Sequence, residues 1–433
     1  MSNIHFKEIL FKSGLAFIFK IAGIILNYVL IFYISKKIGV EAVGIYNISF
    51  VTMLFLAMVF TLGLNFSITR FTGEYINDKT KLRKLYNKCL QLVVPASFLG
   101  AFFLYLFSDY IALNFYKDVQ YARALKIISI ISPMYILTVF NIEYIRGVKK
   151  IIVSEFIRNI INPLLIIIAL FVLSFYDLNE LSTLYGIAVS VFIGFGFSMF
   201  STIRYNNGFV NSEKGNISSK ELLSPSIPLL IMGLAAFFLS ESGLFILEIY
   251  FDSKEVGDYT IIYKISLAGS LIFLTISTII GPKFAELFWA NKTNELKKSI
   301  LYSSKIIFIL SVPVIILLII FSKFLLQIFG LDIELKTSLQ ILITGQFIYA
   351  ITGVAGVYLM VTNKQKVFRN IYIISAILNL MICFLLIPKY GVLGASIAIS
   401  VSYIVLNIIC TIYMHKKEKI IALYLPKITN NEE

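Results

Sequence analysis

The stretch Val43-Gly44-Ile45-Tyr46 recurs 213 positions later as Val256-Gly257-Asp258-Tyr259. At the same offset, Arg70-Phe71 recurs as Lys283-Phe284 and Lys79-Thr80 recurs as Lys292-Thr293. Three separated matches at one offset, without a gap over roughly forty residues, indicate an internal repeat. The chain is therefore predicted to consist of two related halves.

Composition identifies the class of protein. Of the 433 residues, 58% are hydrophobic and only 14% are charged, and the mean hydropathy is +0.87. The apolar residues come in runs near 20 residues, the length with which a helix crosses about 30 Å of hydrocarbon. Because the backbone of such segments must satisfy its own hydrogen bonds, we expect an all-α integral membrane protein.

Twelve transmembrane helices are predicted, six in each half. They fall near residues 14–34, 44–66, 89–108, 124–145, 152–174, 183–203, 226–249, 258–281, 301–322, 337–360, 368–387 and 392–414. An even number of spans in each half makes the repeat parallel, as in transporters that expose a central cavity to alternate sides. The predicted domains are an N-terminal six-helix lobe (1–204), a polar cytoplasmic linker (205–225) and a C-terminal six-helix lobe with a short cytoplasmic tail (226–433).

Charge predicts the orientation. The N-terminal side carries 25 of the 38 Lys and Arg residues and the opposite side carries 8, which places both termini in the cytoplasm by the positive-inside rule. The net charge of +14 is thereby explained by loops that face anionic membrane lipids, and nucleic acid is not expected as a partner.

The sequence gives little support to an enzyme or a metal protein. Three scattered cysteines (Cys89, Cys383 and Cys410) and two histidines near the termini (His5 and His415) predict neither a disulfide framework nor a metal site. A phosphate-binding GKS/T loop, a DxD pair and a catalytic Ser/His/Asp set are all absent. We expect no catalytic residues and no cofactor.

Ionisable residues inside spans cost about 2.5–3.5 kcal/mol each on insertion scales, so they are candidate functional residues. Lys20 lies in the first span with Asn27 seven residues later on the same face. Glu241 lies near the middle of the seventh span, and Glu248 follows on its face. Each lysine near a span end could instead extend its amine to the interface, and Glu241 could belong to a buried structural pair.

The eighth span adds Lys264 beside a polar stripe that includes Tyr259, Tyr263 and Ser266. Charged residues gathered on the first, seventh and eighth spans predict one shared cavity, although small polar residues also pack helices together. Their repeat equivalents are uncharged, since Lys20 aligns with Gly233, Glu241 with Tyr28 and Lys264 with Val51. Function is therefore expected where the halves differ.

Other charged residues have simpler explanations. Arg70 and Lys283 occupy equivalent positions at the predicted cytoplasmic mouth, where they form either a symmetric gate or ordinary positive-inside anchors. On the fifth span Glu155 and Arg158 could pair with each other, as could Glu143 and Arg146 at the end of the fourth.

Several short motifs resemble one family across the whole length. They are Ile38-Gly39 with Gly44-Ile45-Tyr46, then Gly63 with Arg70-Phe71 and Glu74-Tyr75, and Pro388-Lys389-Tyr390-Gly391-Val392-Leu393-Gly394-Ala395, whose first four residues link the last two spans tightly. In this order they resemble the polysaccharide flippase family of Wzx-like lipid-linked oligosaccharide exporters, in the superfamily of the multidrug and toxin extruders.

The resemblance implies two lobes in a V shape around a central cavity, no cofactor, and a polyprenyl-diphosphate-linked oligosaccharide as substrate. It also implies coupling to a cation or proton gradient in the cell (inner or plasma) membrane. Under this interpretation Lys20 and Lys264 attract the diphosphate. The other residues of the substrate cavity are Asn27, Tyr259, Tyr263 and Ser266. Glu241 and Glu248 bind the ion whose gradient drives transport. Polysaccharide polymerases and glycosyltransferases are further candidate partners.

Two alternatives stay open at the level of sequence. A multidrug extruder of the same fold would favour acidic cavity residues such as Glu241 and Glu248. A membrane polysaccharide polymerase would be expected to carry a large outward loop with paired catalytic residues, whereas the longest outward loops predicted here have only about 15 residues.

Overall fold

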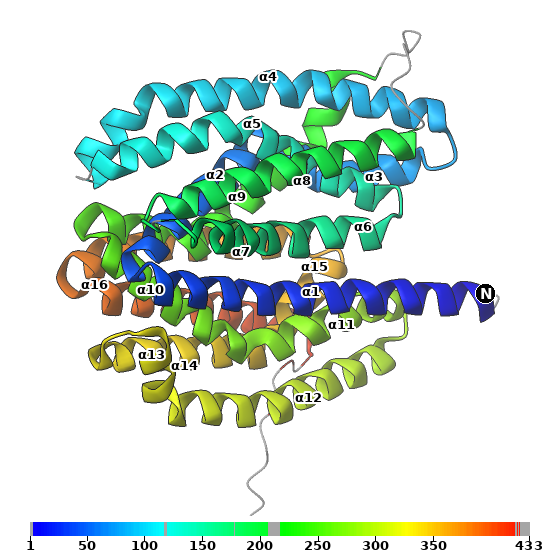
Figure 1. The fold of residues 1–433 in the computed structure, drawn as a ribbon. Coiled ribbons are helices and arrows are strands. Elements are labelled where there is room, and N and C mark those ends of the chain that lie inside the picture. Colours follow the sequence, from blue (N-terminus) through cyan, green and yellow to red (C-terminus); the bar gives the residue numbers. More distant parts are fainter. Residues whose placement is uncertain are drawn as a thin grey trace, which may run out of the picture. The chain divides into compact units, whose positions relative to one another are not determined.

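A computed structural model describes residues 3–116, 119–176, 178–206 and 217–420, together with Ala422 and Tyr424. These residues are almost entirely helical and include no strand (Figure 1). The first part comprises α1 (Asn3–Lys37), α2 (Val40–Phe60), α3 (Leu64–Glu74), α4 (Lys79–Ile111), η1 (Ala112–Tyr116), α5 (Val119–Gly147), α6 (Ile151–Phe156), η2 (Ile157–Ile161), α7 (Asn162–Leu173) and α8 (Ser182–Asn206). The second comprises α9 (Ser219–Tyr250), α10 (Ser253–Leu267), η3 (Ala268–Ser270), α11 (Leu271–Trp289), α12 (Thr293–Ile320), α13 (Ser322–Phe329), η4 (Ile333–Leu335), α14 (Lys336–Thr352), α15 (Val354–Val361) and α16 (Gln365–Glu418).

The expected all-α membrane architecture is confirmed. Within the described ranges, ten helices are long and apolar enough to cross a membrane, or eleven if the pair Ile333–Thr352 and Val354–Val361, bent by 47°, is one span. The predicted count of twelve is compatible with this number, because α16 contains two helices.

The 54 residues of α16 would extend for about 80 Å as one straight helix, far more than a bilayer core requires. The chain instead turns at Gly391, whose backbone is non-helical with a φ of +52°. Three residues later, a Cβ added to Gly394 would lie 2.6 Å from the backbone carbonyl carbon of Leu386. Glycine is needed at both positions, first for the positive φ and then for the close approach of the returning helix.

Contacts between residues divide the chain into two compact units. Unit 1 comprises Met1–Leu234 and Asp252–Gly257, and unit 2 comprises Ala235–Phe251 and Asp258–Glu433. The division falls inside α9 and again near the start of α10. The predicted domain limits at residues 204 and 226 stay a prediction.

Unit 1 is organised around α5, which packs against α2, α3, α4 and α8. A buried polar network joins three of these helices. The hydroxyl of Tyr86 on α4 donates to Oδ1 of Asn141 on α5 at 2.8 Å, and Nδ2 of Asn141 donates to Oγ of Ser198 on α8 at 3.3 Å. Because buried polar groups are costly unless paired, this network favours one register among the three helices.

Unit 2 has a comparable centre at Asn379, in the first part of α16. Its Nδ2 donates to Oγ of Ser242 on α9 at 2.7 Å, and its Oδ1 accepts from Oγ of Ser402, in the second part of α16, at 3.3 Å. Asn379 is buried and therefore ties α9 to both parts of α16 inside the unit.

The repeated glycines take part in a reciprocal contact within unit 1. A Cβ added to Gly44 would lie 2.1 Å from the carbonyl oxygen of Ser253, and one added to Gly257 would lie 2.1 Å from that of Val40. The offset of 213 relates Gly44 to Gly257 and also relates Val40 to Ser253. The backbone partners of the two repeated glycines are therefore themselves equivalent in the repeat, and neither glycine position has room for a side chain.

We expect Gly44→Ala and Gly257→Ala each to destabilise the protein by about 1–3 kcal/mol, because the added methyl group displaces backbone rather than a flexible side chain. Thermal unfolding of the purified protein in detergent measures the loss. Gly73→Ala on α3 is the matched control, because nothing lies within 4 Å of the added carbon and alanine favours the helix. Equal melting temperatures for all three variants would contradict the close backbone contacts of Gly44 and Gly257.

Candidate functional site

The predicted site residues of the first span lie on α1, which packs against α6 and η2 in unit 1. Two contacts fix the level of Lys20. The ring of Phe19 lies 5.5 Å from that of Phe156, and a Cβ added to Gly23 would meet Asn159 at 2.6 Å. Lys20 therefore lies at the level of η2, and it is half-buried. Asn27, also half-buried, donates its amide to the carbonyl of Gly23 on its own helix at 2.8 Å.

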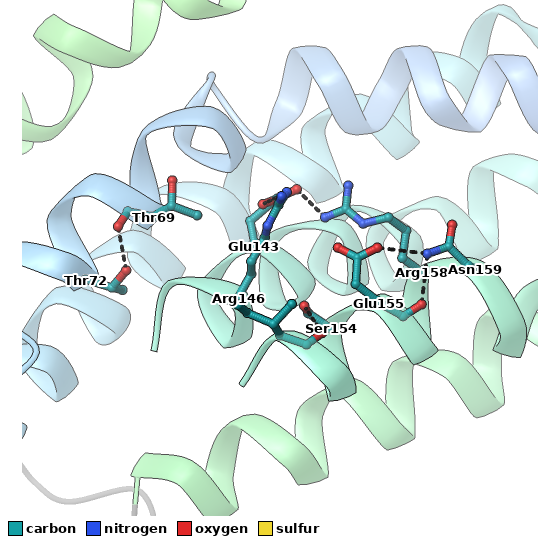
Figure 2. A network of polar contacts seen from close by, with 9 residues as sticks. Thr69, Thr72, Glu143, Arg146, Ser154, Glu155, Arg158 and Asn159 are labelled. Carbon is teal, nitrogen blue, oxygen red and sulfur yellow. Dashed lines mark hydrogen bonds and ion pairs between the residues drawn. The ribbon is translucent and has the colours of Figure 1, made fainter. Parts of the chain in front are cut away.

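A charged network joins α5 to η2, the turn against which α1 packs (Figure 2). Arg158 on η2 forms a short ion pair through Nη2 with Oε1 of Glu143 on α5, and Nη1 of Arg146 lies 3.8 Å from Oε2 of Glu143. Glu155 accepts a hydrogen bond from Asn159 through Oε2 at 2.9 Å. The suggested Glu143–Arg146 pair is confirmed, whereas Arg158 pairs with Glu143 instead of Glu155.

The π-helical turn η2 has a local cause in the sequence. Pro163, at the start of α7, has no N–H to donate to the carbonyl four residues earlier, which belongs to Asn159. An interrupted hydrogen-bond ladder is a common origin of π-helical bulges, which often occur at functional sites. Gly23 of α1 makes its close approach at this same Asn159 carbonyl. The irregular turn thus aims Arg158 at Glu143 from within a span.

A second candidate cluster lies in unit 2 and contains two of the predicted residues. Glu241 on α9 and Lys264 on α10 are both half-buried, and both belong to unit 2. The ring of Tyr263 stacks on that of Tyr259, with centroids 5.8 Å apart and planes 8° apart. Tyr263 directly precedes Lys264 on α10, and a shared site formed by these residues stays a prediction.

Two tyrosines of this cluster were missed. Tyr403 on α16 lies near Tyr263, and the ring of Tyr403 lies 5.0 Å from that of Tyr349 on α14. Tyr349 and Tyr403 are half-buried near the middle of the predicted tenth and twelfth spans. A polar aromatic residue at mid-span was the signal available in the sequence.

The other predicted cavity residues of unit 2 are buried against neighbouring helices. Tyr259 is 1% exposed, and its hydroxyl would lie 3.3 Å from a Cβ added to Gly243 on α9. Ser266 is fully buried, and its Oγ donates to the carbonyl of Tyr263 at 2.7 Å. Glu248 is 1% exposed. Their roles in binding and coupling stay predictions.

The predicted gate residues are both exposed. Arg70 lies on α3 in unit 1, and Lys283 lies on α11 in unit 2, where its Nζ is 3.0 Å from Oε1 of Glu286. Over the ranges that the structure describes, no group of three or more His, Cys, Asp or Glu residues is placed to hold a metal ion.

Comparison with known proteins gives the chain a family. The sequence profile described as polysaccharide biosynthesis protein matches residues 10–288, well over half of the chain. The chain belongs to this family. A second profile, MatE, matches residues 228–385.

Individual relatives agree with this membership. The putative O-antigen transporter of Shigella flexneri is 22% identical over 398 residues, which cover 86% of this chain and 89% of that protein. The probable low-salt glycan biosynthesis flippase Agl15 of Haloferax volcanii is 22% identical over 54% of this chain and 48% of its own. Among solved structures, the lipid II flippase MurJ in its inward closed conformation has a TM-score of 0.70 at 16% identity, with 94% and 88% of the two chains covered, which establishes a shared fold.

A double-mutant cycle tests the pair in unit 2. We expect Glu241→Ala and Lys264→Ala together to cost less than the sum of the single variants, with a coupling of about 1–3 kcal/mol, because each single change removes one of two opposite charges within spans of the same unit. Denaturant unfolding of the full chain in detergent micelles measures each term. The exposed pair Lys283 and Glu286 is the control, with an expected coupling below about 0.5 kcal/mol. Equal coupling energies in the two cycles would contradict a stronger interaction between Glu241 and Lys264 than between the exposed residues Lys283 and Glu286.

Proposed function

We propose that the protein is a flippase that moves a polyprenyl-diphosphate-linked oligosaccharide from the cytoplasmic to the outer leaflet for the assembly of cell-surface polysaccharide. The observation that carries the proposal is that the polysaccharide biosynthesis profile matches residues 10–288, which include Lys20 on α1 and Arg158 on η2, two elements that pack together. Relatives named as an O-antigen transporter and a glycan flippase support the same substrate class.

The physical problem for such a protein is to move charge and hydrated sugar through hydrocarbon. Desolvating an isolated ion costs tens of kcal/mol in a Born estimate, so a diphosphate requires fixed polar groups that replace its water. Lys20 and Lys264 supply positive charge inside spans, and the tyrosines around Tyr263 supply hydroxyl groups for a glycan. The long polyprenyl chain is apolar and can remain in the bilayer.

Transport against a gradient requires coupling, and we assign this role to Glu241 with a cation or proton as the coupling ion. Glu241 is half-buried on α9, inside a segment long and apolar enough to cross a membrane, where a carboxylate is costly without a functional role. A group in this position changes its interaction with Lys264 whenever it binds or releases a cation. If this change in the interaction between Glu241 and Lys264 opens the cavity to one side of the membrane and closes it to the other, binding and release of the cation produce alternating access.

The multidrug extruder is the second candidate, and two observations favour it. The MatE profile matches residues 228–385, which include Lys264 and Tyr263. Tyrosine rings beside a carboxylate are also suited to organic cations. The flippase is preferred because the polysaccharide biosynthesis profile covers more of the chain, and a relative that matches over most of both chains is named a putative O-antigen transporter. Membership of this family leaves the polymerase alternative without support.

The proposal includes a location and partners. We place the protein in the cell membrane, inner or plasma, with both termini on the cytoplasmic side, because Lys and Arg are concentrated in the loops of that side. Membrane lipids surround it. Glycosyltransferases that build the lipid-linked sugar, and a polymerase that consumes it on the far side, are the enzymes with which it would work.

Reconstitution in liposomes with a fluorescent polyprenyl-diphosphate oligosaccharide tests the function. We expect the wild type to translocate this lipid under an ion gradient, and Glu241→Ala to slow translocation at least about tenfold, since the coupling carboxylate is lost. Quenching of the outer-leaflet fluorophore reports the rate. Glu286→Ala, which removes an exposed carboxylate, is the matched control and should transport normally. The flippase proposal fails if the wild type does not move the lipid and Glu241→Ala alters only drug efflux.

A further inference from the structure

Glu143 joins two arginines that come from different elements of unit 1. One carboxylate oxygen pairs with Arg158 on η2, and the other lies 3.8 Å from Nη1 of Arg146, one turn along α5. The carboxylate side chain is only 16% exposed, whereas Arg146 is 49% and Arg158 is 37% exposed. The acid is therefore more enclosed than the two arginine side chains with which it pairs (Figure 2).

The position of Arg158 is fixed by the helix on which it lies. The π-helical turn is held between Pro163, which interrupts the hydrogen-bond ladder, and Gly23 of α1, which packs against Asn159. Arg158 lies seven positions after Ile151, about 10 Å along the span. An arginine at this depth requires a counter-ion, and Glu143 provides it.

The charges around this pair do not balance. Lys20, Arg146 and Arg158 carry three positive charges, whereas Glu143 and Glu155 carry two negative ones. Glu155 is engaged by the amide of Asn159 through Oε2. If Glu143 alone moved away, the two guanidinium groups would face each other without an anion between them. Their planar forks match the oxygens of a phosphate group, which can bond both at once.

We propose that Glu143 is a displaceable counter-ion, and that a phosphate-bearing group takes its place between Arg146 and Arg158. This inference rests on the proposed function and deepens it, because the diphosphate of the lipid-linked oligosaccharide would be the displacing group. Glu143 keeps the arginines paired while the site is empty. It also competes with the bound anion and so promotes its release.

Binding of inorganic pyrophosphate to the full-length protein in phosphatidylcholine nanodiscs tests the competition. We expect Glu143→Gln to bind pyrophosphate about tenfold more tightly, since the competing charge is removed while an amide oxygen remains to accept from the arginines. Arg158→Lys should bind about tenfold more weakly, since a fork is replaced by a point charge. Isothermal titration measures both. If Glu143→Gln does not fold, Glu143→Asp replaces it, with an expected gain of about threefold.

Asp109→Asn is the matched control, because Asp109 pairs at 2.8 Å with Lys126 at the other end of α5 and is 60% exposed. This variant should bind pyrophosphate as the wild type does. Unchanged or weaker binding by the Glu143 variant would overturn the counter-ion, and so would an equal gain in Asp109→Asn. Neither outcome bears on the flippase proposal, which is judged by translocation in the wild type.

The same phosphate chemistry is present in the headgroups of anionic membrane lipids. Polyprenyl diphosphate and phosphatidylglycerol are therefore compared as competitors of pyrophosphate in the same nanodiscs. A substrate site is supported if polyprenyl diphosphate displaces pyrophosphate more strongly than phosphatidylglycerol does. In that case Glu143→Gln should also translocate the lipid more slowly, because the bound diphosphate is released more slowly. Stronger competition by phosphatidylglycerol, with translocation unchanged, overturns the substrate assignment and identifies a lipid headgroup as the displacing group.

Discussion

A hydrocarbon environment offers no water to an unpaired backbone group, and the rest of this structure depends on that constraint. Straight helices satisfy it by themselves, so every interruption must be compensated locally. Pro163 frees the carbonyl of Asn159, which meets Gly23 on α1 within a π-helical turn. The same turn carries Arg158 to Glu143. The position of the Arg158 side chain inside unit 1 thus follows from the π-helical turn that accommodates Pro163.

Much of the fold could be predicted because its signals are local. Apolar runs of the right length identify most spans, and the segment that ends at Gly391 predicts the tight link that the positive φ provides. The π-helical turn and the 47° bend between α14 and α15 were not predicted. Both depend on which neighbouring helix supports the irregular backbone, and hydrophobic periodicity does not carry that information.

The candidate sites divide along the same line. A charge inside a span is visible in the sequence, so Lys20, Glu241 and Lys264 could be selected as candidates, and their roles stay predictions. The partner of a charge is a tertiary fact, and Arg158 therefore bonds an acid fifteen positions away instead of the nearby Glu155. The orientation of a small polar side chain is equally hidden, as Ser266 illustrates by donating to its own helix. The pair Glu143 and Arg146, one turn apart on a helix, was predictable, whereas the pairing of Arg158 with an acid on another helix was not.

The reciprocal contact of Gly44 and Gly257 has a consequence for how such a protein can acquire an asymmetric site. Mutual contacts of this kind are those of a twofold homodimer, in which every side chain occurs twice around the axis. A dimer of one half would have to carry Lys264 and Glu241 in duplicate, with like charges repeated within a membrane. A single chain that contains both copies keeps the reciprocal glycine contact and can carry a charged residue in one copy alone. The positions equivalent to Lys264 and Glu241 are occupied by the uncharged residues Val51 and Tyr28. Covalent linkage of the halves thereby removes a symmetry constraint that no substitution could relieve in the dimer.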